Sequence, residues 1–349
     1  MQIFLVITAL VALPLLLWAG PRWYRGRQSK RDRQRLEDAL KHLFEVEYRG
    51  RLGSLASIGG ALTLRGSAVV EVVTRMQSQG LIEARGQEFA LTPAGARLAL
   101  QVVRAHRLLE RYFADEARLP LRDVHRAAER QEHSLSPADA DRLSAALGHP
   151  TLDPHGDPIP TREGLVAPAA GTPATSWPQG KLGRIVHLED EPEISFAQIV
   201  AEGLRVGQFL QVLDSDANHV SMTDGEREFR LAPAVAANVF LAAADRTGWP
   251  ERVVRLSDLD DDRLAEVVTL DDACQGFSRR RLMDLGFTEG ARIRPALRTF
   301  AGDPRAYTVR GTTIALRRDQ ASQVLVRPIE EVEARSPGSL DPGKVAVGS

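Results

Sequence analysis

The sequence predicts an α+β protein, with helices in its first half and strands in its second half. Apolar residues recur at helical spacing up to residue 147, and short β-like runs alternate with turn residues from residue 181 onward. One uncharged apolar run stands at the N-terminus. The length of 349 residues suggests two or three domains, and the net charge of −1 indicates no strongly acidic or basic partner.

The N-terminus reads IFLVITALVALPLLLWAG over residues 3–20, without a charged residue. As a helix this run would be roughly 27 Å long, which matches a bilayer core. The positive charges follow the run, whereas a cleaved signal peptide carries them before it. We therefore expect a transmembrane anchor over 1–21 and a basic juxtamembrane segment over 22–35. The expected location is the cell membrane, with the N-terminus outside and the bulk of the chain cytoplasmic.

Residues 36–96 predict a winged helix-turn-helix. Leucines lie at helical spacing within 33–49, and two short helical patterns follow at 54–62 and 67–79. The residues after Gly80, LIEARGQEFALTPAG, form two strand-like runs around a polar turn. This order of helices and hairpin is typical of DNA-binding domains. A small helical domain that does not bind nucleic acid is the alternative.

The next two predicted helices carry histidines and glutamates at helical spacing. Thr92 and Pro93 open a helix that contains His106 and Glu110 four residues apart. The second helix, Leu121–Ser134, contains His125, Glu129, Glu132 and His133. Steps of four, three and one place these four on one helix face, and imidazoles with carboxylates are ligands for a divalent transition metal. Solvated charged faces are the alternative to a metal site.

The second half of the chain predicts two small SH3-like β-barrels, over 181–245 and 253–328. The two are weakly repeated, since LRVGQFLQV and FTEGARIRPAL each enter a strand after a turn glycine. A low-complexity linker over 165–180 precedes them, and a polar tail over 331–349 is expected to be disordered.

Enzymatic function is not expected. Cys274 is the only cysteine of the chain, so neither an intrachain disulfide nor a cysteine-based zinc site can form. No nucleophile–base pair or substrate-binding motif accompanies the candidate metal ligands.

With this order established, residues 36–160 resemble the metal-dependent repressors of the diphtheria-toxin-repressor and manganese-transport-regulator type. The matching strings are LEDALKHLFEVE, VVTRMQSQGLIE, LTPAGARLA, AHRLLERYF, DVHRAAERQEHSLS and GHPTLDPHGDPIP. The last string is especially specific, because neither helix propensity nor winged-helix physics demands it. In this family a divalent metal, bound between the DNA-binding and dimerisation helices, locks a homodimer for operator binding. The resemblance thus implies a metal-binding and dimerisation domain over 97–164.

The resemblance also implies which residues bind the metal. It places one site at Asp38, Glu129, Glu132 and His133, and an ancillary site at His106, Glu110 and His125. Oxygen ligands at Asp38 and Glu129 in place of sulfur favour Mn(II), with Fe(II) as the alternative. Lys41 stands where the manganese type has a glutamate, which argues against a faithful binuclear centre of that type. A further ancillary ligand would come from the first barrel, where Glu193 is nearby in register.

For DNA, the resemblance implies contacts from Arg65, Ser67, Arg75 and Arg85. Val70 and Glu71 depart from the neutral polar surface that the family presents, and a carboxylate near phosphates is unfavourable. Both residues lie on the face that would read DNA, so they argue against operator binding by this helix.

Residues 253–328 resemble the FeoA-type domain of ferrous-iron transport systems, through VRLSDL, RRRLMDLGFTEGARI and VRGTTIALRRDQA. Such domains are small interaction modules. The leading prediction is a membrane-tethered transcriptional repressor that senses Mn(II) or Fe(II) and binds double-stranded operator DNA as a homodimer. The alternative is a membrane-anchored metal-sensing module without operator binding, which would partner a ferrous-iron or manganese transporter through its FeoA-like domain.

Overall fold

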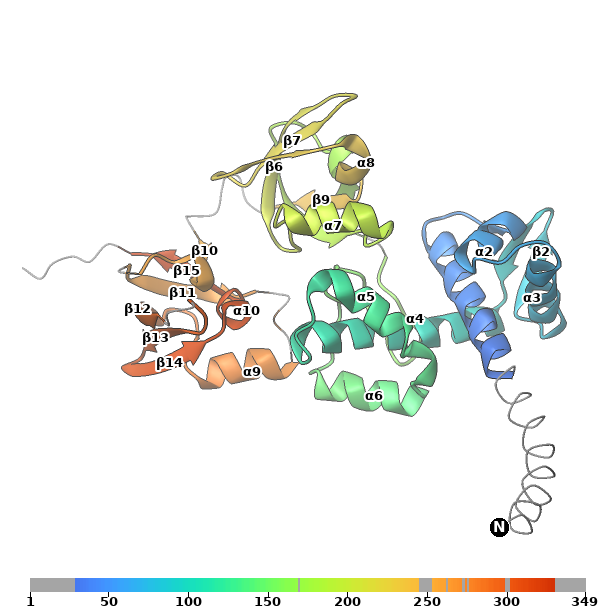
Figure 1. Cartoon of the computed structure of the whole chain (residues 1–349), viewed down its shortest axis with the longest axis horizontal. Helices are drawn as coiled ribbons and strands as arrows, with labels where there is room; N and C mark the ends of the chain where they lie inside the picture. Colours follow the sequence, from blue (N-terminus) through green and yellow to red (C-terminus); the bar gives the residue numbers. More distant parts are fainter. Residues whose placement is uncertain are drawn as a thin grey trace, which may run out of the picture. The chain divides into compact units, whose positions relative to one another are not determined.

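A computed structural model describes residues 29–168, 170–244, 253–261, 263–271, 274, 276–298 and 302–329 (Figure 1). The chain folds into two compact units that divide near residue 249. The first unit contains the helical domains, a three-stranded sheet and a six-stranded sheet, and the second unit contains the other six-stranded sheet. The α+β class predicted from the sequence is confirmed.

Residues 29–91 form three helices and a small sheet, called the reading head below. Its elements are the helix over residues 29–48, α2 (Leu55–Ala61), α3 (Ser67–Ser78), β1 (Gly53–Ser54), β2 (Ile82–Arg85) and β3 (Glu88–Leu91). The sheet has the order β1-β3-β2, so the β2–β3 hairpin is the wing. Leu40, Leu43, Ile58 and Met76 are fully buried and join the three helices in one core. The predicted winged helix-turn-helix order is present.

Helix α4 (Pro93–Asp115) begins at the predicted position. Thr92 Oγ1 accepts a hydrogen bond from the Gly95 N–H at 3.2 Å, and Pro93 occupies the first turn, where an N–H is not needed. Gly95 packs so close to the reading head that an added Cβ would lie 2.0 Å from the Leu81 carbonyl oxygen. The start of α4 is therefore held against the wing.

The single helix predicted over Leu121–Ser134 is two elements, α5 (Leu121–Glu129) and the short 3-10 helix η1 (Glu132–Ser134). Ser136 forms a capping box that starts the next helix, α6 (Pro137–Ala146), so the chain must leave the α5 axis before that residue. The η1 residues turn toward α4 and make the polar contacts described below. The prediction that four ligands share one helix face is therefore wrong.

Two antiparallel six-stranded sheets with equivalent strand orders make up the β half, β4-β9-β5-β6-β7-β8 and β10-β15-β11-β12-β13-β14. The first consists of β4 (Thr172–Pro173), β5 (Leu182–Leu188), β6 (Phe209–Ser215), β7 (Val220–Thr223), β8 (Glu228–Leu231) and β9 (Val239–Ala243), with α7 (Glu193–Ala201) and α8 (Pro233–Ala236). The second consists of β10 (Val254–Arg255), β11 (Ala265–Leu270), β12 (Arg292–Arg298), β13 (Arg305–Val309), β14 (Thr312–Leu316) and β15 (Val324–Pro328), with α9 (Gly276–Asp284) and α10 (Arg318–Ala321).

The weak repeat seen in the sequence corresponds to equivalent backbone contacts. The turn glycine Gly207 donates to the Ile185 carbonyl oxygen in the first sheet at 2.7 Å. Gly290 donates to the Val267 carbonyl oxygen in the second sheet at 2.9 Å. In both sheets a register shift begins at that accepting residue. Each turn glycine thus sets the entry of the following strand, β6 or β12, in the same way.

The expected linker over 165–180 is partly built into the first sheet. Strand β4 pairs with β9, and η2 (Ala174–Ser176) follows it directly. Ala174 and Trp177 are buried in the core of this sheet, and Trp177 Nε1 donates to the Lys181 carbonyl oxygen at 2.9 Å. The apolar surface that Trp177 buries stabilises an ordered structure here, although the composition of residues 165–180 is typical of a loop.

The prediction of a cell-membrane location requires a correction. Among the described residues, no helix has the length and apolar character needed to cross a bilayer. The expected span over residues 3–20 and the expected disordered tail over 331–349 lie outside the described residues, as do residues 22–28 of the basic segment. Its remaining residues, 29–35, belong to the helix over residues 29–48.

Candidate metal centre

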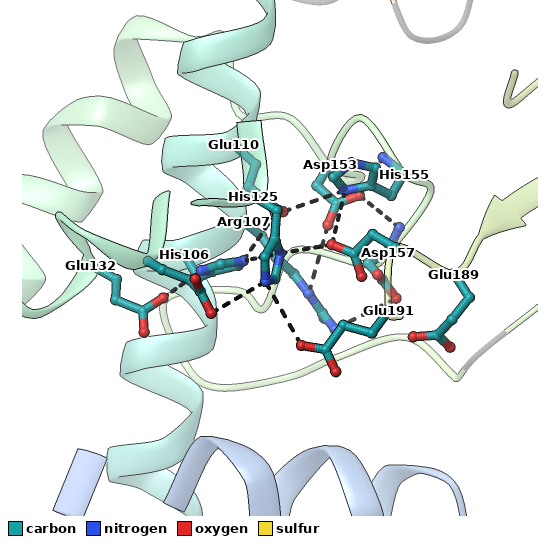
Figure 2. Close-up of polar contacts among 12 residues, drawn as sticks. His106, Arg107, Glu110, His125, Glu132, Asp153, His155, Asp157, Glu189 and Glu191 are labelled. Carbon is teal, nitrogen blue, oxygen red and sulfur yellow. Dashed lines mark hydrogen bonds and ion pairs between the residues drawn. The ribbon is translucent and has the colours of Figure 1, made fainter. Parts of the chain in front are cut away.

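The three residues predicted for the ancillary site come together between α4 and α5 (Figure 2). His106 Nε2 lies 2.9 Å from Glu110 Oε1 and 3.2 Å from His125 Nδ1. His125 Nδ1 in turn lies 3.1 Å from Glu110 Oε1. His106 and Glu110 are buried one turn apart on α4, so the i, i+4 spacing aims both at the same point. We call these three residues the α4–α5 cluster.

A second cluster joins the reading head to η1. Asp38, from the helix over residues 29–48, lies with Glu132 and His133, and their ligand atoms are all within 4.8 Å of one another. His133 Nε2 is 2.9 Å from Asp38 Oδ1 and 3.5 Å from Glu132 Oε1. We call these residues the head cluster. Its members come from two domains, so a cation bound there would connect them.

Glu129 lies apart from the head cluster, although the sequence assigned it there. Its Oε1 is 3.4 Å from His125 Nε2, and its side chain is 51% exposed. The end of α5 at this residue is the reason, because the chain turns before it reaches Glu132. The structure therefore places Glu129 beside the α4–α5 cluster.

A third cluster, which the sequence reasoning missed, consists of the buried residues Glu110, Asp153 and His155. His155 Nδ1 lies 3.8 Å from Glu110 Oε2 and 3.7 Å from Asp190 Oδ2. Neither ring nitrogen of His155 has a hydrogen-bond partner, which is unusual for a buried imidazole and suits a ligand. The available signal was the His and Asp pair inside the family-specific string GHPTLDPHGDPIP.

The loop after β5 contributes Asp190 to these clusters. Asp190 Oδ2 lies 2.7 Å from His125 Nδ1. Glu193, the residue considered from the sequence, begins α7, pairs with Arg126 and is 68% exposed. In this structure it is therefore Asp190, three residues before Glu193, that contacts the α4–α5 cluster.

The protonation states of the clusters are strongly shifted. Burial opposes the charged form of His133, but hydrogen bonds to Asp38 and Glu37 outweigh it and raise its pKa to about 9. Burial likewise opposes a charged His155, yet Glu110 raises its pKa to about 10. For Glu132, burial is outweighed by His106 and Lys41, and its pKa falls to about 2. Protons on imidazoles thus balance the carboxylates, and a bound metal would displace them.

Glu37, which the sequence analysis did not consider, and Lys41, which it noted as a departure from the manganese type, also contact the clusters. Glu37 Oε2 lies 2.7 Å from His133 Nδ1, on the side of the ring opposite to Asp38. Lys41 Nζ lies 3.0 Å from both His106 Nδ1 and Glu132 Oε2. The helix over residues 29–48 explains both contacts, because positions 37 and 41 lie on the same face of it as the predicted ligand Asp38.

The residues predicted to contact DNA lie on the surface of the reading head. Arg65 and Ser67 are exposed at the start of α3. Arg75 Nη1 is 3.6 Å from Asp32 Oδ2, and Arg85 on the wing donates to Glu83 Oε1 at 2.8 Å. These two ion pairs are partly exposed, so each restrains its arginine only weakly.

Comparison with known proteins identifies two family matches. Residues 92–161 match the metal binding and dimerisation domain of iron dependent repressors, and residues 254–328 match the FeoA domain. The chain is 37% identical to the iron-dependent repressor IdeR of Mycobacterium leprae over 150 residues, which are 43% of this chain and 64% of that relative.

Two further relatives extend the match. The chain is 30% identical to the diphtheria toxin repressor of Corynebacterium diphtheriae over 213 residues, which are 57% of this chain and 93% of that protein. A solved manganese-dependent transcriptional repressor in complex with manganese superposes with a TM-score of 0.54 at 26% identity, covering 59% of this chain and all of the other. This chain therefore belongs to the diphtheria-toxin-repressor family of metal-dependent repressors, and it carries a FeoA domain.

Proposed function

We propose that this protein is a metal-dependent transcriptional repressor, which binds Mn(II) or Fe(II) and acts as a homodimer on operator DNA. The convergence of Asp38 with Glu132 and His133 carries the proposal, because it joins the reading head to the metal-binding domain. A ligand that binds better to one arrangement of two elements shifts the population toward it. A cation in the head cluster would favour one orientation of the reading head.

The donor atoms fit Mn(II) or Fe(II). The three clusters offer carboxylate oxygens and imidazole nitrogens, which hard and borderline divalent ions prefer. The ring nitrogens of the buried His155 make no hydrogen bond, which suits a metal ligand. The iron-dependent and manganese-dependent repressors among the relatives support the same pair of metals.

A titration of the full chain tests the proposal. Mn(II), or Fe(II) without oxygen, is expected to raise the affinity for promoter DNA, and EDTA is expected to abolish this gain. The affinity should also fall as salt rises, because phosphate contacts release counterions. His133→Ala should remove most of the metal effect. His219→Ala should preserve it, because His219 lies with Asp214 and Asp216 in a separate group that does not include the reading head. Equal DNA affinity with and without EDTA would refute the proposal.

A metal-sensing module that does not bind operators is the second candidate. The exposed face of α3 favours it, since Val70 is 48% exposed there and Glu71 adds a carboxylate. For this candidate, the titration would yield metal binding without salt-dependent DNA binding at any metal concentration.

A further inference from the structure

Lys41 connects the α4–α5 cluster with the head cluster. Its Nζ lies 3.0 Å from His106 Nδ1 and 3.0 Å from Glu132 Oε2, and the last two atoms also contact each other directly. The Lys41 side chain is only 13% exposed. The ammonium group is therefore enclosed between one residue of each cluster.

His106 and Glu132 each present one atom to their own cluster and the other to Lys41. His106 Nε2 faces Glu110 and His125, while Nδ1 faces the ammonium. Glu132 Oε1 lies on the side of His133, while Oε2 accepts from Lys41. Figure 2 shows the hydrogen bond between His106 and Glu132, which connects the two clusters directly.

An ammonium group donates hydrogen bonds and has no lone pair to offer a metal. It supplies one positive charge at a fixed point, and it engages a carboxylate oxygen that could otherwise bind a cation. Glu132 has two oxygens, so it could bridge two ions if both were free. With Oε2 held by Lys41, Glu132 has only Oε1 for an ion in the head cluster.

We propose that Lys41 is the residue that keeps the two clusters as separate single-ion sites, because its ammonium occupies the position of a second, Glu132-bridged divalent cation. The proposal rests on the proposed function only in requiring that ions bind at these clusters. In wild-type protein each Mn(II) is then magnetically isolated. Replacement of Lys41 by a carboxylate would add an oxygen ligand, release Glu132 Oε2 and create a bridged pair.

The test measures Mn(II) binding and electron paramagnetic resonance on the full chain. Lys41→Glu is expected to bind one more Mn(II) per chain than wild type and to show an exchange-coupled signal, whereas wild type shows isolated Mn(II). Lys41→Gln removes the fixed charge beside both clusters and is expected to raise Mn(II) affinity about tenfold. Lys181→Gln, directly before β5, is the control and should match wild type.

The outcomes separate this proposal from the proposed function. An unchanged Mn(II) count with isolated ions in a folded Lys41→Glu protein would overturn the role of Lys41, as would a coupled pair in wild type. If Lys41→Glu does not fold, the Lys41→Gln variant tests the proposal instead. A Mn(II) affinity of Lys41→Gln that is equal to or weaker than that of wild type would then overturn the role of Lys41. Failure of wild type to bind either Mn(II) or Fe(II) would instead refute the proposed function.

Discussion

Glu189 holds Arg49 with both carboxylate oxygens, each 2.7 Å from Arg49 Nη2. Arg49 directly follows the helix over residues 29–48 of the reading head. Glu189 is the neighbour of Asp190, whose carboxylate lies 2.7 Å from His125. This ion pair therefore links the reading head to the loop after β5, from which Asp190 approaches the α4–α5 cluster.

Glu189→Gln tests this link. The change preserves the shape of the side chain and removes its charge, so Mn(II) affinity should stay within about twofold of wild type. Partly exposed ion pairs contribute about 0.2–1 kcal/mol, so the metal-induced gain in DNA affinity should fall about two- to fivefold. Anisotropy titrations with labelled promoter DNA measure this gain. Glu228→Gln, exposed on β8, is the control, and an unchanged gain would show that the pair does not transmit metal binding.

Glu37 should orient His133. Its carboxylate lies 2.7 Å from Nδ1, which leaves Nε2 directed at Asp38. Loss of such an outer carboxylate typically weakens metal binding about 10- to 100-fold, so Glu37→Gln should reduce Mn(II) affinity by this factor without changing the number of ions bound at saturation. Arg33→Gln, which removes the exposed partner of the other Glu37 oxygen, should have an effect below about threefold. Equal affinities of the two variants would argue against an orienting role.

The metal-free protein should lose stability as pH rises from 6.5 to about 9. His133 is buried, but its hydrogen bonds to Asp38 and Glu37 raise its pKa from 6.5 in the unfolded chain to about 9 in the folded protein. The contribution of protonated His133 to the free energy of unfolding is therefore complete below pH 6.5 and is lost as the pH rises past 9. Thermal denaturation between pH 6.5 and 9 measures this loss of stability. In the His133→Asn variant the melting temperature should depend less on pH than in wild type.

Mn(II) affinity should change with pH in the opposite direction. Each imidazole proton that the ion displaces should raise the affinity about tenfold per pH unit below the pKa of that group. Calorimetry in two buffers of different ionisation enthalpy counts the protons released. An affinity that is flat between pH 6.5 and 8.5 would mean that His133 and His155 do not bind the metal.

Gly95 and Gly60 should respond oppositely to alanine. A Cβ at Gly95 would lie 2.0 Å from the Leu81 carbonyl oxygen, so Gly95→Ala should lower the free energy of unfolding by about 1–3 kcal/mol. Gly60 lies in α2 with nothing within 4 Å of an added Cβ, so Gly60→Ala should raise it by up to about 1 kcal/mol. Urea denaturation measures the free energy of unfolding of both variants. An unchanged free energy for Gly95→Ala would mean that the backbone at Leu81 can move away from the added Cβ without loss of stability.

Local features of this chain could be predicted from its sequence alone. The cap at Thr92 and Pro93, the helix order of the reading head and the pairing of His106 with Glu110 depend on residues close together in the chain. The turns at Gly207 and Gly290 are local in the same sense, since both glycines adopt the positive φ that glycine favours. Each is determined by backbone propensity or helical spacing, which a sequence displays directly.

The composition of the clusters could not be predicted in this way. Helical spacing relates residues only while one helix continues, and α5 ends at Glu129, so Glu129 and Glu132 separate. The buried His155 reaches Glu110, and Asp190 reaches His125 and His155, from loops far along the chain.

The sequence by itself determined the elements of this protein and most of the ligand types. Only the tertiary structure decided which ligands meet, and that Lys41 lies between His106 and Glu132. The physical reason is that contacts between elements depend on how buried faces pack, and one helix end or one turn redirects every side chain beyond it.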